Sequence, residues 1–254
     1  MKVLACYSLK GGVGKTTTSV CLAHISATLG FRTLLFDLDT QGSATWLLRT
    51  KRSSGNGLTK AARGISKGEK KARSQIVGSD YDNLDLLPYG IETIGLDLQL
   101  SNMKRPEQGA SRILGLAEGD YDLVVVDLPP SAGNLAQSVL KESDRVIFVM
   151  TPSMLSIHAL VEAKDRIPTV AKQKTSVLFT MVQERRKTDL AAIGLVESDG
   201  NHVLSTRIVK STLFDRMQEK RAPIALSAPN SKASHDYHAL FEEVSKMLDL
   251  DKLR

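Results

Sequence analysis

Short apolar runs rich in β-branched residues alternate with longer amphipathic stretches along the whole chain. The runs have the length of buried strands, and the stretches between them have the length and periodicity of helices. This alternation predicts an α/β fold, with a mostly parallel β-sheet flanked by helices on both faces. The predicted strands cover residues 2–7, 33–37, 84–87, 122–127, 145–150, 176–181 and 202–206.

A helix is predicted over residues 17–29, directly after the first strand, and a last helix over residues 234–248. The apolar residues that share one face of the last helix are Leu240, Val244, Met247 and Leu248. We expect this face to pack on the sheet, because an amphipathic helix buries its apolar stripe.

The run KGGVGKTT at residues 10–17 predicts a phosphate-binding loop. The strict P-loop pattern has a glycine six residues before the lysine, but Leu9 stands there and Lys10 follows it. The glycines of the loop let successive N–H groups turn inward around an anion. Lys15 would neutralise terminal phosphate oxygens, and Thr16 would place its hydroxyl on a magnesium ion. A glycine-rich turn without a ligand is the alternative interpretation.

Carboxylates follow two other predicted strands. Asp37 and Asp39 lie on the same side of their strand, so both could face a metal and the terminal phosphate, although a strand-end carboxylate can also cap the next helix. Asp127 ends an apolar strand as a Walker B aspartate does. Ligands bind beyond the carboxyl ends of strands in open α/β sheets, so we expect residues 37–41 and 127–131 to converge with the phosphate loop.

The chain has 254 residues, a formal net charge of +6 and a sequence pI near 9.3. This length suits a single domain over residues 1–254. Residues 49–78, rich in Gly, Ser, Lys and Arg, are predicted to form an exposed basic excursion. Further basic stretches lie at 164–187 and 207–221. Such stripes favour nucleic acid as a partner, with solvated loop charge as the alternative.

The two cysteines have no C-x-x-C spacing, which argues against a disulfide framework, a zinc site or an iron-sulfur cluster. The five histidines show no ligand cluster. Apolar runs fall far short of the roughly 20 residues that a membrane helix needs, and no signal pattern opens the chain. We therefore expect a soluble cytoplasmic protein.

Three segments together resemble the nucleotide motifs of the ParA/MinD family of deviant Walker ATPases. They are KGGVGKTT at 10–17, DLDTQG at 37–42 and DLPPS at 127–131. Further matches to ParA proteins lie at 83–88, 204–208 and 228–232. The resemblance implies a deviant Walker P-loop NTPase fold, with ATP and Mg²⁺ as cofactors. It also implies a ParA-type protein without an N-terminal helix-turn-helix domain, since the phosphate loop begins at once.

The resemblance implies a role for each matching position. The catalytic residues would be Lys15 at the β- and γ-phosphates, Asp39 at the attacking water and Lys10, which would reach the partner's nucleotide in an ATP-bound dimer. The metal-binding residues would be Thr16, Asp39 and Asp127. The expected nucleotide-binding residues are Lys10, Gly11, Gly12, Val13, Gly14, Lys15, Thr16, Thr17, Asp127, Pro129, Ile208, Val209 and Pro229. Two departures are Thr40, where a proline is usual, and Val209, where many relatives have a proline near the adenine.

The resemblance implies a slow, Mg²⁺-dependent ATPase that dimerises with ATP and positions a DNA or protein cargo. It would bind nucleoid DNA without sequence preference and would leave it when a ParB-like or cargo-adaptor protein stimulates hydrolysis. The expected DNA-binding residues are Arg185, Arg186, Lys187, Arg207 and Lys210. The basic segment 49–73 is a rival site.

Two other classes remain as alternatives. A MinD-like membrane ATPase needs a basic amphipathic helix at its C-terminus, whereas residues 246–254 interleave acids with leucines, so we expect no membrane partner. A metabolic P-loop enzyme or a reductase component is the other class. Basic stripes suit a small-molecule enzyme poorly, and paired cluster cysteines are missing.

Overall fold

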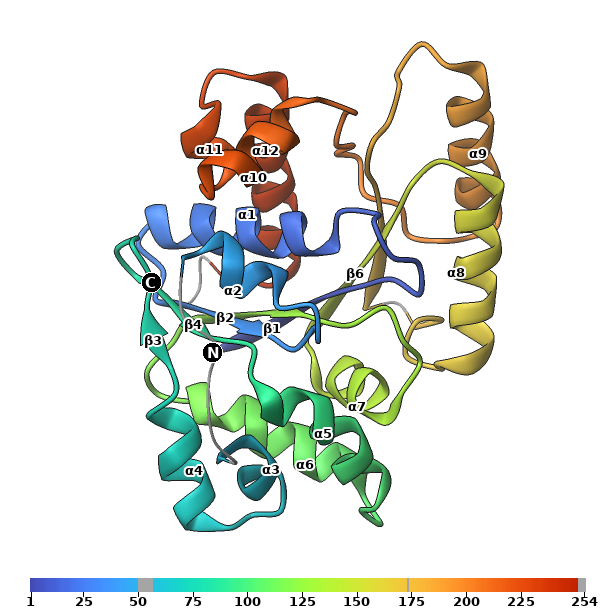
Figure 1. Ribbon diagram of the computed structural model, residues 1–254. Coiled ribbons are helices and arrows are strands. Elements are labelled where there is room, and N and C mark those ends of the chain that lie inside the picture. Colours follow the sequence, from blue (N-terminus) through green and yellow to red (C-terminus); the bar gives the residue numbers. More distant parts are fainter. Residues whose placement is uncertain (50–56, 173, 251–254) are drawn as a thin grey trace.

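The computed structural model describes residues 1–49, 57–172 and 174–250. Within them one sheet runs in the order β3-β4-β2-β5-β1-β6-β7, and only β3 is antiparallel to its neighbour (Figure 1). The strands are β1 (Lys2–Tyr7), β2 (Thr33–Asp37), β3 (Val77–Gly78), β4 (Leu84–Leu87), β5 (Leu123–Asp127), β6 (Arg145–Met150) and β7 (Thr175–Phe179). The predicted fold class is confirmed. The central strands are buried on both faces, as their unbroken apolar runs require.

Helices cover both faces of this sheet (Figure 1). One face carries α1 (Lys15–Thr28), α2 (Ser43–Leu47), α10 (Leu213–Lys220), α11 (Ile224–Ser227) and α12 (Lys232–Met247). The other apolar cluster includes residues of α3 (Gly57–Ala62), α4 (Ser66–Arg73), α5 (Ile91–Ser101), α6 (Pro106–Leu114), α7 (Asn134–Glu142), α8 (Met154–Arg166) and α9 (Lys187–Ser198). The sheet therefore separates two apolar clusters, and its strand ends remain open to a site.

The first and last predicted helices are confirmed, each starting two residues earlier than expected. Ser231 sets the start of α12, because its side chain accepts a hydrogen bond from the Ser234 N–H. The predicted apolar face of α12 is buried against α1, except that Met247 is only partly buried. This packing occupies the face of α12 that a membrane anchor would need to expose.

The predicted strand over residues 202–206 is wrong. Val203 forms only an isolated bridge with Val177 at the edge of β7. The N–H groups of Ser205 and Thr206 donate instead to the Glu243 carboxylate, at 2.8 and 3.1 Å. Because this side chain on α12 takes those donors, a strand ladder cannot continue. The other strand predictions agree to within two residues, and the two-residue β3 was not predicted.

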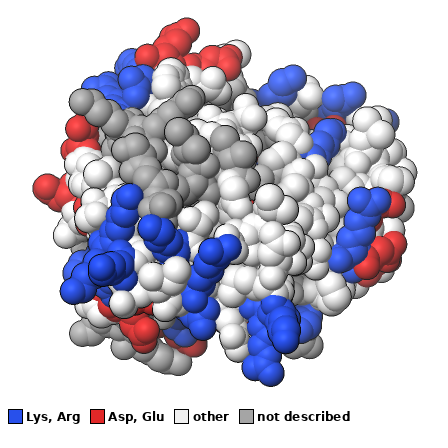
Figure 2. Space-filling model, turned by 60° about the horizontal axis from the view of Figure 1, so that its bottom comes forward, with Lys and Arg blue, Asp and Glu red and all other residues white. Residues whose placement is uncertain are grey.

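The exposed excursion predicted over residues 49–78 needs correction. Its part at 50–56 lies outside the described residues, but residues 57–73 form α3 and α4, which pack against each other. Apolar residues of this pair are buried in the core cluster: Leu58, Ala61, Ala62 and Ala72. Gly68 permits the close approach, since a Cβ there would lie 2.3 Å from the Lys60 Cβ. Basic side chains remain on the outer surface of this part of the molecule (Figure 2).

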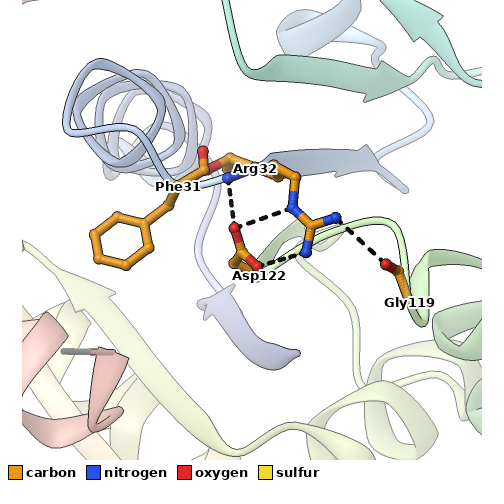
Figure 3. A network of polar contacts seen from close by, with 5 residues as sticks. Phe31, Arg32, Gly119 and Asp122 are labelled. Carbon is orange, nitrogen blue, oxygen red and sulfur yellow. Dashed lines mark hydrogen bonds and ion pairs between the residues drawn. The ribbon is translucent and has the colours of Figure 1, made fainter. Parts of the chain in front are cut away.

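A polar network ties the starts of β2 and β5 together, at the end of the sheet opposite the phosphate loop (Figure 3). The Arg32 backbone N–H and its Nε both donate to Asp122 Oδ2, at 2.9 and 3.3 Å. Nη2 donates to Asp122 Oδ1 at 2.8 Å, and Nη1 to the Gly119 carbonyl at 3.4 Å. These hydrogen bonds from Arg32 lower the pKa of the Asp122 carboxyl.

We expect Arg32→Ala to lower the melting temperature at pH 7 by about 2 °C or less, because the pair is largely solvated. A lowered carboxyl pKa stabilises the folded state above the unfolded value near 3.9 and loses this effect as pH falls below it. The difference between the two proteins should therefore shrink below pH 4 in calorimetric scans. Arg32→Lys, which lacks the bidentate geometry, should give an intermediate value. A difference that grows in acid would contradict this interpretation.

Among the described residues, no helix combines the length and the apolar character needed to cross a bilayer.

Candidate functional site

A cavity of about 670 Å³ opens at the carboxyl ends of the strands, and all three predicted motifs contribute to its wall. The predicted residues that line it are Gly11, Gly12, Gly14, Lys15, Thr16, Thr17, Asp39, Ile208 and Lys210. Sequence reasoning missed lining residues on α2, on α10 and at the end of β7, among them Trp46, Thr180, Met181, Phe214 and Gln218. These come together only through the topology of the sheet, so no local pattern reveals them.

The phosphate loop has the geometry of an anion cradle. Gly12 and Gly14 adopt φ values of 74° and 92°, in the left-handed region that favours glycine. Gly14 caps α1 without any side-chain hydrogen bond, so the first N–H groups of the helix are left for a ligand. Lys15 is only 6% exposed although it lines the cavity. The loop therefore offers directed donors and a buried cation to an anionic group.

The residue that follows β7 holds the phosphate loop by a hydrogen bond. Thr180 donates its hydroxyl to the Val13 carbonyl at 2.7 Å. The Val13 side chain is buried in the core, so this predicted binding residue contributes backbone rather than side chain to the loop. Lys10 lies half-buried outside the lining of the cavity, and its N–H donates to Ser8 Oγ at 3.2 Å.

Thr16 and Asp127, both predicted to bind the metal, are in direct contact. Thr16 Oγ1 donates to Asp127 Oδ2 at 2.7 Å, and Ser19 Oγ donates to Oδ1 at 3.2 Å. Burial, followed by the charge of Asp37, raises the pKa of Asp127 to about 7. A cation in this place would favour the ionised carboxylate, so the oxygen donors suit Mg²⁺. No three His, Cys, Asp or Glu side chains of the described residues form a metal cluster.

The two carboxylates of the second motif, Asp37 and Asp39, lie in different environments. Asp37 Oδ2 accepts hydrogen bonds from the Thr45 N–H at 2.8 Å and from Thr45 Oγ1 at 2.6 Å. Asp37 therefore caps α2, which is the alternative role expected for a strand-end carboxylate. Burial raises its pKa to about 6, and its Oδ1 has no hydrogen-bond partner in the described structure. Asp39 instead lines the cavity, with Oδ1 accepting from the Gln41 N–H at 3.0 Å.

Other predicted nucleotide contacts lie outside the cavity lining. Pro130 lines the cavity rather than Pro129, and Pro229 is not part of the wall. Val209 is held by an isolated bridge to Val182, and its N–H donates to Asp236 Oδ2 at 3.3 Å. Residues of α10 and of the segment at 208–212 do line the cavity.

The predicted DNA-binding residues do not form one surface patch of unpaired cations. Arg185, Arg186 and Lys187 are exposed at the start of α9, where Arg186 Nε lies 3.6 Å from Asp189 Oδ1. Arg207 forms an ion pair, at 3.3 Å, with Glu197, which belongs to α9. Lys210 lines the nucleotide cavity instead.

Comparisons with known proteins agree with this geometry. Residues 1–179 match a family model described as an AAA domain. The chain is 30% identical to the sporulation initiation inhibitor protein Soj of Bacillus subtilis, over 96% of this chain and 98% of Soj. It is 28% identical to the virulence plasmid ParA family protein pGP5-D of Chlamydia psittaci, over 99% of this chain and 97% of that protein. This chain belongs to the ParA family of P-loop ATPases.

The fold of this ParA family member also matches solved structures. A McdA variant from Cyanothece, in complex with ATP, superposes with a TM-score of 0.80 at 17% identity, covering 96% of each chain. The family model includes the phosphate loop, Asp39 and Asp127. The residues expected to bind DNA lie beyond residue 179, so they are outside the matched part of that model.

Proposed function

We propose that this ParA family member is a positioning ATPase that forms an ATP-dependent dimer, binds nucleoid DNA and releases it after hydrolysis. The observation that carries the proposal is the cavity at the strand ends that Lys15, Thr16 and Asp39 line, with Asp127 buried behind it and bonded to Thr16. Soj and pGP5-D, the relatives of similar length, support a role in partitioning or positioning. A ParB-like or cargo-adaptor protein would stimulate hydrolysis, and the site of action would be the cytoplasmic nucleoid.

In this proposal, different residues of the site bind the nucleotide and promote its hydrolysis. Lys15 and the N–H groups of the loop would hold the β- and γ-phosphates, and Thr16 and Asp127 would hold Mg²⁺ through the hydroxyl and the carboxylate. When bound, Mg²⁺ would supply positive charge against the phosphate oxygens. Asp39 accepts a proton from the attacking water or orients it. Asp37 keeps α2, and with it the Asp39 loop, in place.

A second copy of the chain would complete the site. Lys10 is not part of the cavity wall, and in this proposal its ammonium group binds a phosphate held by the other subunit. Two large apolar side chains at the start of α8, Met154 and Leu155, are 66% and 74% exposed. They follow β6, at the same edge of the sheet as the phosphate loop. Exposed apolar area at this edge supports a face that a second copy covers.

We expect the ATP-bound dimer to bind unrelated duplexes equally, with affinity that falls steeply as salt rises, because phosphate contacts carry no sequence information. Replacing Arg185, Arg186 and Lys187 by alanine should reduce the log–log salt slope by roughly 0.9 for each DNA phosphate that the variant no longer neutralises. Filter binding with and without ATP over a range of salt concentrations measures this slope.

The matched control removes three exposed cations from the rival surface, Arg63, Lys67 and Lys70, by substitution with alanine. A slope lowered by this control but not by the first variant would move the DNA surface to α3 and α4 (Figure 2). Absence of ATP-dependent DNA binding in the wild type would contradict the proposed nucleoid function. Binding to anionic vesicles instead would favour a MinD-like membrane ATPase.

A further inference from the structure

The C-terminal ends of α2 and α10 are joined reciprocally, although they are far apart in sequence. Arg49, just after α2, donates from Nη2 to the carbonyl of Lys220 at 2.7 Å. Arg221, just after α10, donates from Nε to the carbonyl of Trp46 at 2.7 Å. The Arg221 guanidinium also lies over the Trp46 ring, 5.0 Å from its centroid. Each arginine thus satisfies a carbonyl in the last turn of the other helix.

Both arginines hold a backbone conformation that is unfavourable for them. Arg49 has φ 58° and Arg221 has φ 47°, in the left-handed region where helices usually end in glycine. A glycine could end either helix without this strain, but it could not reach across to the other one. Cations are favourable at helix C-termini because they oppose the negative end of the helix dipole. The contact between the helices therefore accounts for arginine at these two positions.

This junction spans the nucleotide cavity. On one side, α2 follows the Asp39 loop and is capped by Asp37. On the other side, α10 supplies Phe214 and Gln218 to the wall. Trp46 lines the cavity between them and is 50% exposed. A half-exposed indole, held on one side by a guanidinium, leaves an aromatic surface for a planar ligand.

We propose that Trp46, Arg49 and Arg221 form a clasp over the nucleoside end of the nucleotide cavity, in which the Trp46 ring contacts the base or ribose and Arg221 holds the ring in place. This inference rests on the proposed binding of ATP in the cavity. The phosphates are held by the loop, so Trp46 adds affinity for nucleosides and none for phosphates alone. The clasp also fixes the distance between α10 and the helix that follows Asp39.

Trp46 is the single tryptophan of the chain, so its fluorescence reports on the clasp directly. We expect the emission of the wild type to change when Mg·ATP or Mg·ADP is added, and to change little with magnesium and inorganic triphosphate. In calorimetry, Trp46→Ala should weaken ATP and ADP binding about tenfold, as expected when one aromatic side chain no longer stacks on a base. Its affinity for inorganic triphosphate should equal that of the wild type.

Two further variants distinguish a direct contact between Trp46 and the nucleotide from an effect of Trp46 on the fold. Trp46→Phe should recover most of the ATP affinity, because a phenyl ring retains an aromatic face. Arg221→Gln should weaken ATP binding less than Trp46→Ala does and should shift the emission of Trp46 without nucleotide. Arg166→Gln, which removes an exposed cation on α8 paired with Glu162, is the matched control. It should change neither the affinity for ATP nor the emission of Trp46.

The outcomes are distinguishable. Equal ATP affinity in Trp46→Ala and the wild type would overturn the clasp and leave the proposed ATP binding intact. Equal losses of affinity for ATP and for inorganic triphosphate would also overturn it, because Trp46 would then act only through the fold. A wild type that binds neither ligand would overturn the proposed function itself.

Discussion

Replacing Lys15 by alanine is expected to weaken ATP binding by about 100-fold or more, which corresponds to the loss of strong charged hydrogen bonds inside a water-poor site. Lys15 is 6% exposed and stands at the N-terminus of α1, beside two glycines with positive φ in the same loop. Lys10, the other lysine of the three motifs, does not line the cavity, and Lys210, which does, belongs to the segment at 208–212 and not to the phosphate loop. Calorimetric titration with Mg·ATP measures the change in affinity.

Lys10→Ala is the control, since it removes the other lysine of the same motif. We expect this variant to bind ATP normally, because Lys10 is not part of the cavity wall. It should instead fail to form the ATP-dependent dimer, which light scattering detects. If Lys15→Ala bound ATP as the wild type does, or if Lys10→Ala weakened ATP binding to the same degree, the roles given to the two lysines would be wrong.

The sequence was most informative where the signal is local. The phosphate loop is a continuous run, and its glycines, lysine and hydroxyl lie where the motif places them. Strands such as β1 and β5 are continuous apolar runs that match no amphipathic period. These signals determined the fold class and the position of the site before any tertiary contact was known.

Predictions failed where the deciding partner is distant in sequence. The segment 202–206 was predicted to be a strand, but Glu243 on α12 accepts hydrogen bonds from the N–H groups of Ser205 and Thr206. Composition made residues 57–73 look like a solvated loop, although their few alanines and one leucine reach the core.

The cavity residues that were not predicted were missed for the same reason. Trp46 and Arg221 are separated by 175 positions, and no periodicity links them. A positive φ at an arginine is also invisible in sequence, where glycine or asparagine is the usual signal. Local patterns therefore identified the phosphate loop, whereas the cavity wall built by α2 and α10 required the tertiary structure.

The second large effect concerns turnover. Asp39→Asn is expected to reduce ATP hydrolysis about 100-fold, the usual size for losing a group that takes a proton or orients a nucleophile. Asp39 is the carboxylate of its motif that lines the cavity without serving as a helix cap. ATP affinity should stay the same or rise, because a negative charge near the phosphates is removed. Phosphate release and calorimetry separate the two quantities, and unchanged turnover would exclude this role for Asp39.

The same variant has a structural readout that does not depend on nucleotide. Burial raises the pKa of Asp37 to about 6 and that of Asp127 to about 7, and the charge of Asp39 adds to both shifts. A raised carboxyl pKa stabilises the fold below the unfolded value near 3.9, and this effect is lost as pH rises through 6 to 7. Asp39→Asn lowers both pKa values, so the protein without nucleotide should lose less stability between pH 5 and pH 8 than the wild type does. Thermal unfolding at the two pH values checks this, and equal losses in both proteins would show that Asp39 does not act on the buried carboxylates.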